Sequence, residues 1–374
     1  MADEAKKKIM FSGGGTGGSV TPLLAVAAEL LKDEPVDLYF VGSKHGPEKE
    51  LVAAFNESLD ESQKINFWPL SAGKWRRYFS LRNFFDLFII AAGFFQAARI
   101  LRRVQPDIVI TAGSFVSVPL VWAANRQKIP VIIHQQDIRP GLANRLMASG
   151  ARVVTVTFEK SLLDYGPKAV LIGNPSRDLS GYEAEKRETR AKYHINLDQP
   201  LVLAMGGGTG ATALNELIVK ALPDLDQGTQ VIHLTGRGKA DVSAADGRLN
   251  YQALEFVPND EALRLMAAAD LVVSRAGLGA LTELAALSKA TILIPMPNSH
   301  QEDNAALFAR AEAALVLKQD ELSAANLARE INRVLKDGPL RQRLGERLAK
   351  VIKPGAAAKM VDLIWEIISS HEKK

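Results

Sequence analysis

The same short pattern opens both halves of this chain and limits the folds that it can adopt. An apolar, strand-like run at Ile9–Phe11 precedes the glycine loop Gly13–Gly18, and a helical pattern follows from Pro22 to Leu31. In the second half Leu201–Met205 precedes the loop Gly206–Ala211, which also leads into a helical pattern. A strand that passes through a glycine loop into a helix is typical of the start of a Rossmann-like α/β domain. The repeat therefore predicts two Rossmann-like domains in tandem.

The length of 374 residues fits two domains of ordinary size. We place the first at 1–174 and the second at 175–354, with the polar stretch before about residue 199 as the connection between them. An amphipathic helical pattern at Ala357–Ser369 follows Pro354 and Gly355. We expect residues 355–374 to cross back and cap the first domain.

Composition excludes several classes of site. The chain has no cysteine, which rules out disulfides, thiolate zinc sites and cysteine nucleophiles. The start leads directly into an apolar strand, so a signal peptide is not expected. A net charge of +4 suits a phosphate or an anionic lipid surface as partner, and it is too small to indicate nucleic acid.

A strand–helix–strand unit at residues 271–305 predicts a nucleotide site. The strand Leu271–Val273 leads through a glycine-bearing turn into a helix near Leu278, and Glu283 falls in its second turn. A helix N-terminus favours phosphate, and a carboxylate one turn on can accept both hydroxyls of a ribose. The alternative is a structural unit with a solvated glutamate. The next strand, Thr291–Pro295, ends in a polar loop. This loop would lie beside the helix start, at the carboxyl ends of the strands, where open α/β sheets bind ligands.

The first glycine loop also satisfies the G-x-G-x-x-G spacing of dinucleotide sites, through Gly13, Gly15 and Gly18. That motif requires an acidic residue at the end of the second strand, to bind the ribose. The second strand here, Val36–Val41, ends in Gly-Ser-Lys without a carboxylate. The sequence therefore disfavours a nicotinamide cofactor.

A segment of mixed aromatic and basic residues predicts contact with a membrane surface. Its membrane-facing candidates are Trp75, Arg76, Arg77, Tyr78, Phe79 and Arg82. Aromatic rings sit at the level of lipid headgroups and cations meet anionic lipid. The apolar run that follows, Phe84–Phe95, is too short to span a bilayer and contains Asp86. The alternative is a helix buried against the sheet.

Polar side chains also follow the predicted strand Val131–Ile133, as His134, Gln135, Gln136 and Asp137. Strand ends at the carboxyl edge of a parallel sheet are common positions for ligand-binding residues. A single histidine there is more often structural, but four consecutive polar residues indicate a candidate site.

Taken in order, these motifs resemble the MurG family of bacterial glycosyltransferases, which have the GT-B fold. The resemblance covers nearly the whole chain. It rests on GGGTGGSVTPLLAVAAEL, IPVIIHQQD with GLANRLMA, GNPSR, MGGGTGATALNEL, and SRAGLGALTELAAL with HQEDNA. It implies two Rossmann-like domains facing a cleft. The implied reaction is inverting transfer of N-acetylglucosamine from UDP to lipid-linked N-acetylmuramyl-pentapeptide in peptidoglycan synthesis.

The resemblance also implies roles for individual residues. The loop residues thought to meet the acceptor diphosphate are Gly14, Gly15, Thr16, Gly17 and Gly18, of which the last three also count as donor-site candidates. The other donor-site residues are Arg177, Gly208, Val257, Leu278, Gly279, Ala280, Leu281, Thr282, Glu283, Gln301 and Asn304. Among these, Val257 would hold the uracil through its backbone, Glu283 the ribose and Gln301 the sugar, with Asn304 in support. No metal and no cofactor beyond the UDP-sugar co-substrate is implied. The implied location is the cytoplasmic face of the bacterial membrane, as a peripheral protein.

Two departures from the family pattern bear on the catalytic base. The family usually has histidine where this chain has Ser19, and His-Glu-Gln-Asn where this chain has residues 134–137. The expected glutamate is thus an amide, Gln135, and a carboxylate appears at Asp137. We expect Asp137 to serve as base, with His134 and Ser19 as further catalytic candidates. A transferase with another lipid acceptor and an inactive UDP-sugar-binding membrane scaffold remain as alternatives.

Overall fold

The protein is described by a computed structural model that covers residues 6–15, 17–33, 35–71, 81–207, 211–239 and 248–372. The side chains of residues 33, 81–90 and 372 lie outside this description. The chain forms two compact units: unit 1 comprises Met1–Arg177 with Lys353–Lys374, and unit 2 comprises Asp178–Ile352.

Unit 1 is built on a seven-stranded sheet in the order β3-β2-β1-β4-β5-β6-β7, in which every neighbouring pair is parallel. Its strands are β1 (Lys7–Ser12), β2 (Val36–Ser43), β3 (Asn66–Leu70), β4 (Ile108–Thr111), β5 (Val131–Gln135), β6 (Val153–Val156) and β7 (Ala169–Leu171). The central strands are apolar on both faces, as expected when helices cover a parallel sheet from both sides.

The helices of unit 1 bury two cores, one on each face of the sheet. They are α1 (Thr21–Asp33), α2 (Glu48–Asn56), α3 (Leu81–Val104), α4 (Ser117–Arg126), α5 (Leu142–Ala148), α6 (Leu162–Tyr165) and α14 (Ala356–Glu372). Helices α3 and α4 supply one core, and α1 and α14 supply the other.

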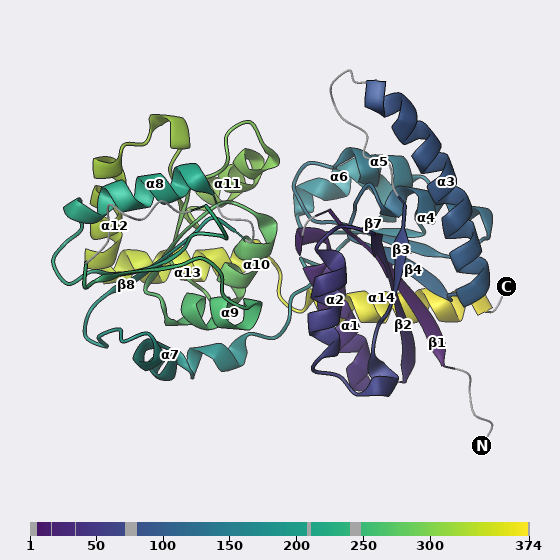
Figure 1. Ribbon diagram of the computed structural model, residues 1–374, viewed down its shortest axis with the longest axis horizontal. Helices are drawn as coiled ribbons and strands as arrows, with labels where there is room; N and C mark the ends of the chain where they lie inside the picture. The colour runs from purple at the N-terminus through teal and green to yellow at the C-terminus, as the bar shows by residue number, and fades with distance from the viewer. Residues whose placement is uncertain are drawn as a thin grey trace. The chain divides into compact units, whose positions relative to one another are not determined.

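Helix α14 returns to unit 1 after the whole of unit 2, as the sequence predicted. It lies beside α1 (Figure 1) and buries Met360, Ile364 and Ile368 in the core with Ile9 and Val26. This arrangement confirms the expected crossing of the C-terminal helix.

Unit 2 has a six-stranded parallel sheet in the order β10-β9-β8-β11-β12-β13. Its strands are β8 (Leu201–Met205), β9 (Gln230–Leu234), β10 (Tyr251–Leu254), β11 (Leu271–Ser274), β12 (Thr291–Leu293) and β13 (Leu315–Val316). Its helices are α7 (Lys186–Lys192), α8 (Thr212–Ala221), α9 (Asn259–Ala268), α10 (Leu278–Ala286), α11 (His300–Arg310), α12 (Ala324–Lys336) and α13 (Gly338–Val351). The two Rossmann-like units confirm the predicted α/β fold class.

The stretch expected as a connection is instead largely part of unit 2. Helix α7 packs against α9, and Lys192 Nζ lies 2.8 Å from Glu261 Oε1. The Tyr182 hydroxyl donates to Asp260, and Arg264 pairs with Glu185. This segment packs through ion pairs on helix surfaces rather than through apolar side chains. Its polar composition therefore resembles that of a loop.

Candidate functional site

Both sheets reverse their strand order at the corresponding place. In unit 1 the chain builds outward from β1 toward β3 and then returns to add β4 on the other side of β1; unit 2 does the same at β8 and β11. Ligands of open parallel sheets bind at the carboxyl ends of the strands beside such a switch point. The loops that follow β1 and β4, and those that follow β8 and β11, are therefore the candidate sites.

In unit 2 the start of α10 presents backbone amides at this edge. Gly277 is the N-cap in extended conformation with no side-chain cap, and the N–H groups of Leu278, Gly279 and Ala280 have no partner within the helix. A Cβ atom built on Gly277 or Gly279 would meet no atom of the described residues within 4 Å. These amides can therefore be approached closely by an anion.

Two residues predicted to extend this row of amides do not fit the geometry. The N–H of Leu281 donates to Gly277 O at 3.0 Å, and the Leu281 side chain is fully buried. Thr282 is buried and its hydroxyl donates to Leu278 O at 2.8 Å. Glu283, in contrast, is half-buried and stands in the second turn of the same helix.

Gln301 and Asn304 lie on α11, which follows the end of β12. The Gln301 Oε1 atom accepts from Met296 N at 3.1 Å, while Ser299 caps the helix through Gln301 N. Asn304 is fully buried and donates to Ala276 O, so it fixes the turn before α10 and is closed to a ligand. Gln301 is half-buried, so a ligand can reach the start of α11.

The remaining donor-site predictions fall in loops. Val257 is half-buried between β10 and α9, at the carboxyl edge of the unit 2 sheet. Arg177 is exposed and ends the first segment of unit 1. Gly208 lies outside the described residues.

Arg275 is a residue of this edge that sequence reasoning missed. The residue is 7% exposed, and its guanidinium donates to Ile294 O at 2.9 Å, Pro295 O at 3.1 Å and Gln319 Oε1 at 2.6 Å. Burial lowers the pKa of Arg275, and these three hydrogen-bond partners are neutral. The turn before α10 therefore holds a buried positive charge. The only sequence signal was an arginine inside an otherwise apolar strand–turn motif.

In unit 1 the first glycine loop is closed on itself. Ser19 Oγ accepts from Gly14 N at 2.9 Å and donates to Gly14 O at 3.1 Å, and Ser114 Oγ also donates to Gly14 O. Ser19 and Gly14 are buried, whereas Gly15 and Gly18 are exposed and Gly17 is half-buried. Thr16 lies outside the described residues. Ser19 therefore has a structural role here, which does not favour it as a catalytic group.

A carboxylate that the sequence did not reveal lies near this loop. Glu48, in the first turn of α2, is fully buried and accepts from Ser43 N at 2.6 Å at the end of β2. Its other oxygen has no hydrogen-bond partner among the described residues, and a side chain at Gly14 would collide with its carboxylate. The group is closed to a ribose, so it does not revive a dinucleotide site.

The polar residues after β5 divide into buried and accessible groups. His134 is fully buried, with Nδ1 3.0 Å from Thr155 Oγ1 and Nε2 2.9 Å from Asn174 Oδ1. Burial lowers the pKa of His134 to about 4. Both ring nitrogens are thus engaged, which does not favour His134 as a base. Asp137 is half-buried in the loop that follows.

None of the side chains predicted to contact a membrane belongs to the described part of the chain: Trp75, Arg76, Arg77, Tyr78 and Phe79 lie outside the described residues, and so does the side chain of Arg82. The adjoining helices α3, α4 and α5 nevertheless expose large apolar side chains: Phe95, Trp122, Leu142 and Leu146. Arg99, Arg102 and Arg145 are exposed on α3 and α5. In the described part of the chain no helix has the length and hydropathy to span a bilayer.

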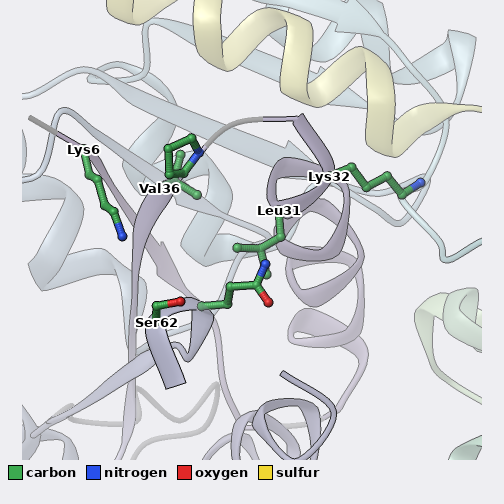
Figure 2. A pocket seen from close by; sticks show the side chains of 7 residues that line it. Lys6, Leu31, Lys32, Val36 and Ser62 are labelled. Atoms are coloured by element: carbon green, nitrogen blue, oxygen red, sulfur yellow. The ribbon is translucent and has the colours of Figure 1, made fainter. Parts of the chain in front are cut away.

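A separate hollow of about 260 Å³ in unit 1 lies at the opposite edge of the sheet (Figure 2). It is lined by Lys6 before β1, Leu31 and Lys32 at the end of α1, and Val36 at the start of β2. Because parallel strands all begin at this edge, the hollow is remote from the strand ends that form the candidate site.

Comparison with known proteins identifies the family. Residues 9–156 match the glycosyltransferase family 28 N-terminal domain, and residues 201–359 match the glycosyltransferase family 28 C-terminal domain. The chain belongs to glycosyltransferase family 28.

Curated relatives within this family cover both units. A UDP-N-acetylglucosamine–N-acetylmuramyl-(pentapeptide) pyrophosphoryl-undecaprenol N-acetylglucosamine transferase of Clostridium botulinum (strain Kyoto / Type A2) is 40% identical over 87% of this chain and 90% of its own. The Lachnospira eligens protein of the same name is 38% identical over 88% of this chain and 92% of its own. These relatives confirm the resemblance to the MurG family.

Solved structures agree with the family assignment. The crystal structure of Acinetobacter baumannii MurG matches with a TM-score of 0.73 at 26% identity, over 96% of this chain and 99% of that one. A UDP-GlcNAc 2-epimerase from Neisseria meningitidis matches with a TM-score of 0.71 at 14% identity, over 96% and 100% of the two chains, which shows a shared fold alone. The family 28 chain therefore has the GT-B fold.

Proposed function

We propose that this family 28 chain transfers N-acetylglucosamine from UDP-N-acetylglucosamine to N-acetylmuramyl-(pentapeptide) pyrophosphoryl-undecaprenol. The observation that carries the proposal is the 40% identity to transferases of that name over 87% of the chain, through both units. The product is the lipid-linked disaccharide used in peptidoglycan synthesis, so the chain is a hexosyltransferase of cell-wall biogenesis.

We assign the UDP-sugar to the carboxyl edge of unit 2. Its diphosphate binds the amides of Leu278, Gly279 and Ala280, which have no partner within the helix at the start of α10. Its ribose hydroxyls bind the Glu283 carboxylate, and its sugar binds Gln301. The buried charge of Arg275 adds a positive potential at the same turn.

The other donor contacts and the acceptor loop follow the family pattern. Val257 holds the uracil through its backbone, and the loop containing Gly208 and the exposed Arg177 complete the donor site. The acceptor diphosphate binds the first glycine loop at its exposed residues Gly15 and Gly18, which flank Thr16 and Gly17. Gly14 supports that loop from within, since its N–H is taken by Ser19.

The reaction is a single displacement with inversion. The acceptor hydroxyl oxygen bonds to C1 of the sugar as the bond from C1 to the UDP oxygen breaks, and Asp137 takes the hydroxyl proton. Negative charge develops on the departing diphosphate, where the amides at the start of α10 stabilise it. Because the helix end supplies this stabilisation, we propose that transfer requires no metal.

The polyprenyl acceptor places the reaction at a membrane surface. The exposed Phe95, Trp122, Leu142 and Leu146, with arginines on the same helices, supply the apolar and cationic groups that bind an anionic bilayer. We therefore propose peripheral attachment at the cytoplasmic face through unit 1.

The decisive experiment supplies UDP-N-acetylglucosamine and a short-chain lipid-linked N-acetylmuramyl-pentapeptide, and follows UDP release together with the disaccharide product. Turnover of both substrates is the expected result. Consumption of the donor only with a different lipid acceptor would replace the acceptor assignment. UDP binding without turnover on any lipid acceptor would indicate a non-catalytic scaffold.

A further inference from the structure

The loop at residues 136–141, between β5 and α5, carries Asp137, and the side chain of Gln135 holds two of its carbonyls. Gln135, the last residue of β5, is 2% exposed. Its Nε2 donates to Asp137 O at 2.6 Å and to Arg139 O at 3.2 Å. The carbonyls of Asp137 and Arg139 therefore both accept from the side-chain amide of Gln135.

The other end of the same amide is also occupied. Gln135 Oε1 accepts from Asn144 Nδ2 at 2.7 Å and from the Tyr165 hydroxyl at 2.9 Å. Burial raises the pKa of Tyr165 to about 12, so its hydroxyl remains a donor at neutral pH. Every donor and acceptor of the amide is thus used. A carboxylate in its place could accept from α5 and α6 but could not donate to the loop.

We propose that Gln135 is a positioning residue for sugar transfer: its amide sets the backbone of residues 137–139 and thereby aims the Asp137 carboxylate. This inference rests on the proposed role of Asp137 as general base. Ser161 Oγ donates to Ile138 O at 3.5 Å, so the carbonyls of three consecutive loop residues are held by side chains. A base needs such fixing, because a displacement of about 1 Å can lower a rate about 100-fold.

The Gln135→Glu variant tests the donors with little change of shape. Its carboxylate would face two carbonyl oxygens that now receive hydrogen bonds, so the loop moves away. We expect kcat to fall about 10- to 100-fold, with KM for UDP-N-acetylglucosamine unchanged because the donor binds unit 2. The matched control is Gln127→Glu, since the Gln127 amide donates to Ala98 O at 3.2 Å in the same unit. The control should keep its kcat.

A double-mutant cycle separates positioning from general support of the fold. If Gln135 acts through Asp137, the change Gln135→Glu lowers kcat in the parent but not further in the Asp137→Asn background. An equal loss of kcat in both backgrounds would overturn the inference. An unaltered kcat in Asp137→Asn alone would instead remove the proposed base, and the inference with it, without affecting the donor assignment.

Stability must be followed alongside, by the melting temperature of each variant. If Gln135→Glu does not fold, Gln135→Met removes both donors without adding charge, and the same pattern in the cycle is expected. Tyr165→Phe removes only one bond to Oε1 and leaves both donors to the loop. It should keep kcat within about fivefold of the parent, because a net hydrogen bond contributes about 1 kcal/mol. A loss as large as that of Gln135→Glu would contradict a role specific to the loop.

Discussion

Glu283 is the residue on which the donor assignment depends most directly. A carboxylate that binds two ribose hydroxyls makes charge-assisted hydrogen bonds worth about 1.5–3 kcal/mol. Replacing Glu283 with Gln should therefore weaken UDP binding about 10- to 100-fold. Isothermal titration with UDP measures the change. Glu302→Gln, an exposed residue at the start of α11, is the matched control and should bind as the parent does. Equal affinity in Glu283→Gln would refute the assignment.

Two buried histidines make stability depend on pH in the acidic range. Burial lowers the pKa of His134 and of His233 to about 4, from 6.5 in an unfolded chain. Between these values the unfolded state binds more protons, so stability is complete above pH 6.5 and is lost as the pH falls toward 4. Each histidine accounts for about 3 kcal/mol over this window.

Urea unfolding at pH 7 and pH 4.5 checks this dependence. His134→Gln should flatten the pH response of unit 1, and His233→Gln that of unit 2. His371→Gln, which replaces an exposed histidine on α14, should leave the response as it is in the parent. If His134→Gln and His233→Gln both keep the parent's dependence of stability on pH, other groups cause the loss of stability in acid.

The sequence predicted individual residues only where local spacing places them. Glu283 could be placed relative to the start of its helix because both lie within one strand–turn–helix motif. The hydrogen bonds of Gln135 could not be predicted in this way, since its partner Tyr165 is 30 residues away, on α6. The burial of Arg275 likewise depends on a distant partner, since its guanidinium donates to Ile294 O, 19 residues further along the chain.

At the scale of elements, α14 is an integral part of the unit 1 core. Ile364 is fully buried, whereas Glu366 on the same helix is exposed. Truncating a buried isoleucine to alanine typically costs about 2–5 kcal/mol. Ile364→Ala should therefore lower the free energy of unfolding of unit 1 by this amount, and Glu366→Ala should change it little. Urea denaturation measures both; equal midpoints would show that α14 is dispensable for unit 1.

The regular elements were predictable because their signals are periodic and local. The strand expected at Leu271–Val273 is β11, which extends one residue further, and the helix expected near Leu278 begins there as α10. The segment after residue 178 was misjudged because α7 is stabilised by ion pairs with α9. An amphipathic apolar stripe, the usual sign of a packed helix, is weak in such a segment.

At the scale of the whole molecule, the two units bury separate cores: two lie on the faces of the unit 1 sheet, and unit 2 has a core of its own. A ligand that binds one unit should therefore protect that unit first. At 100 times its Kd, UDP should stabilise the unit that holds it by about 2.7 kcal/mol.

Hydrogen exchange with and without UDP shows where this protection falls. We expect slower exchange in unit 2, concentrated in α10 and at the start of α11, because the proposed phosphate and sugar contacts lie there. Exchange in α1 and α14 should change little, since both helices belong to the core of unit 1. The Glu283→Gln variant at the same UDP concentration is the control and should lose most of the protection. Protection found mainly in the glycine loop of unit 1 would place UDP in the wrong unit for the proposed reaction, because the donor and acceptor assignments would then be exchanged.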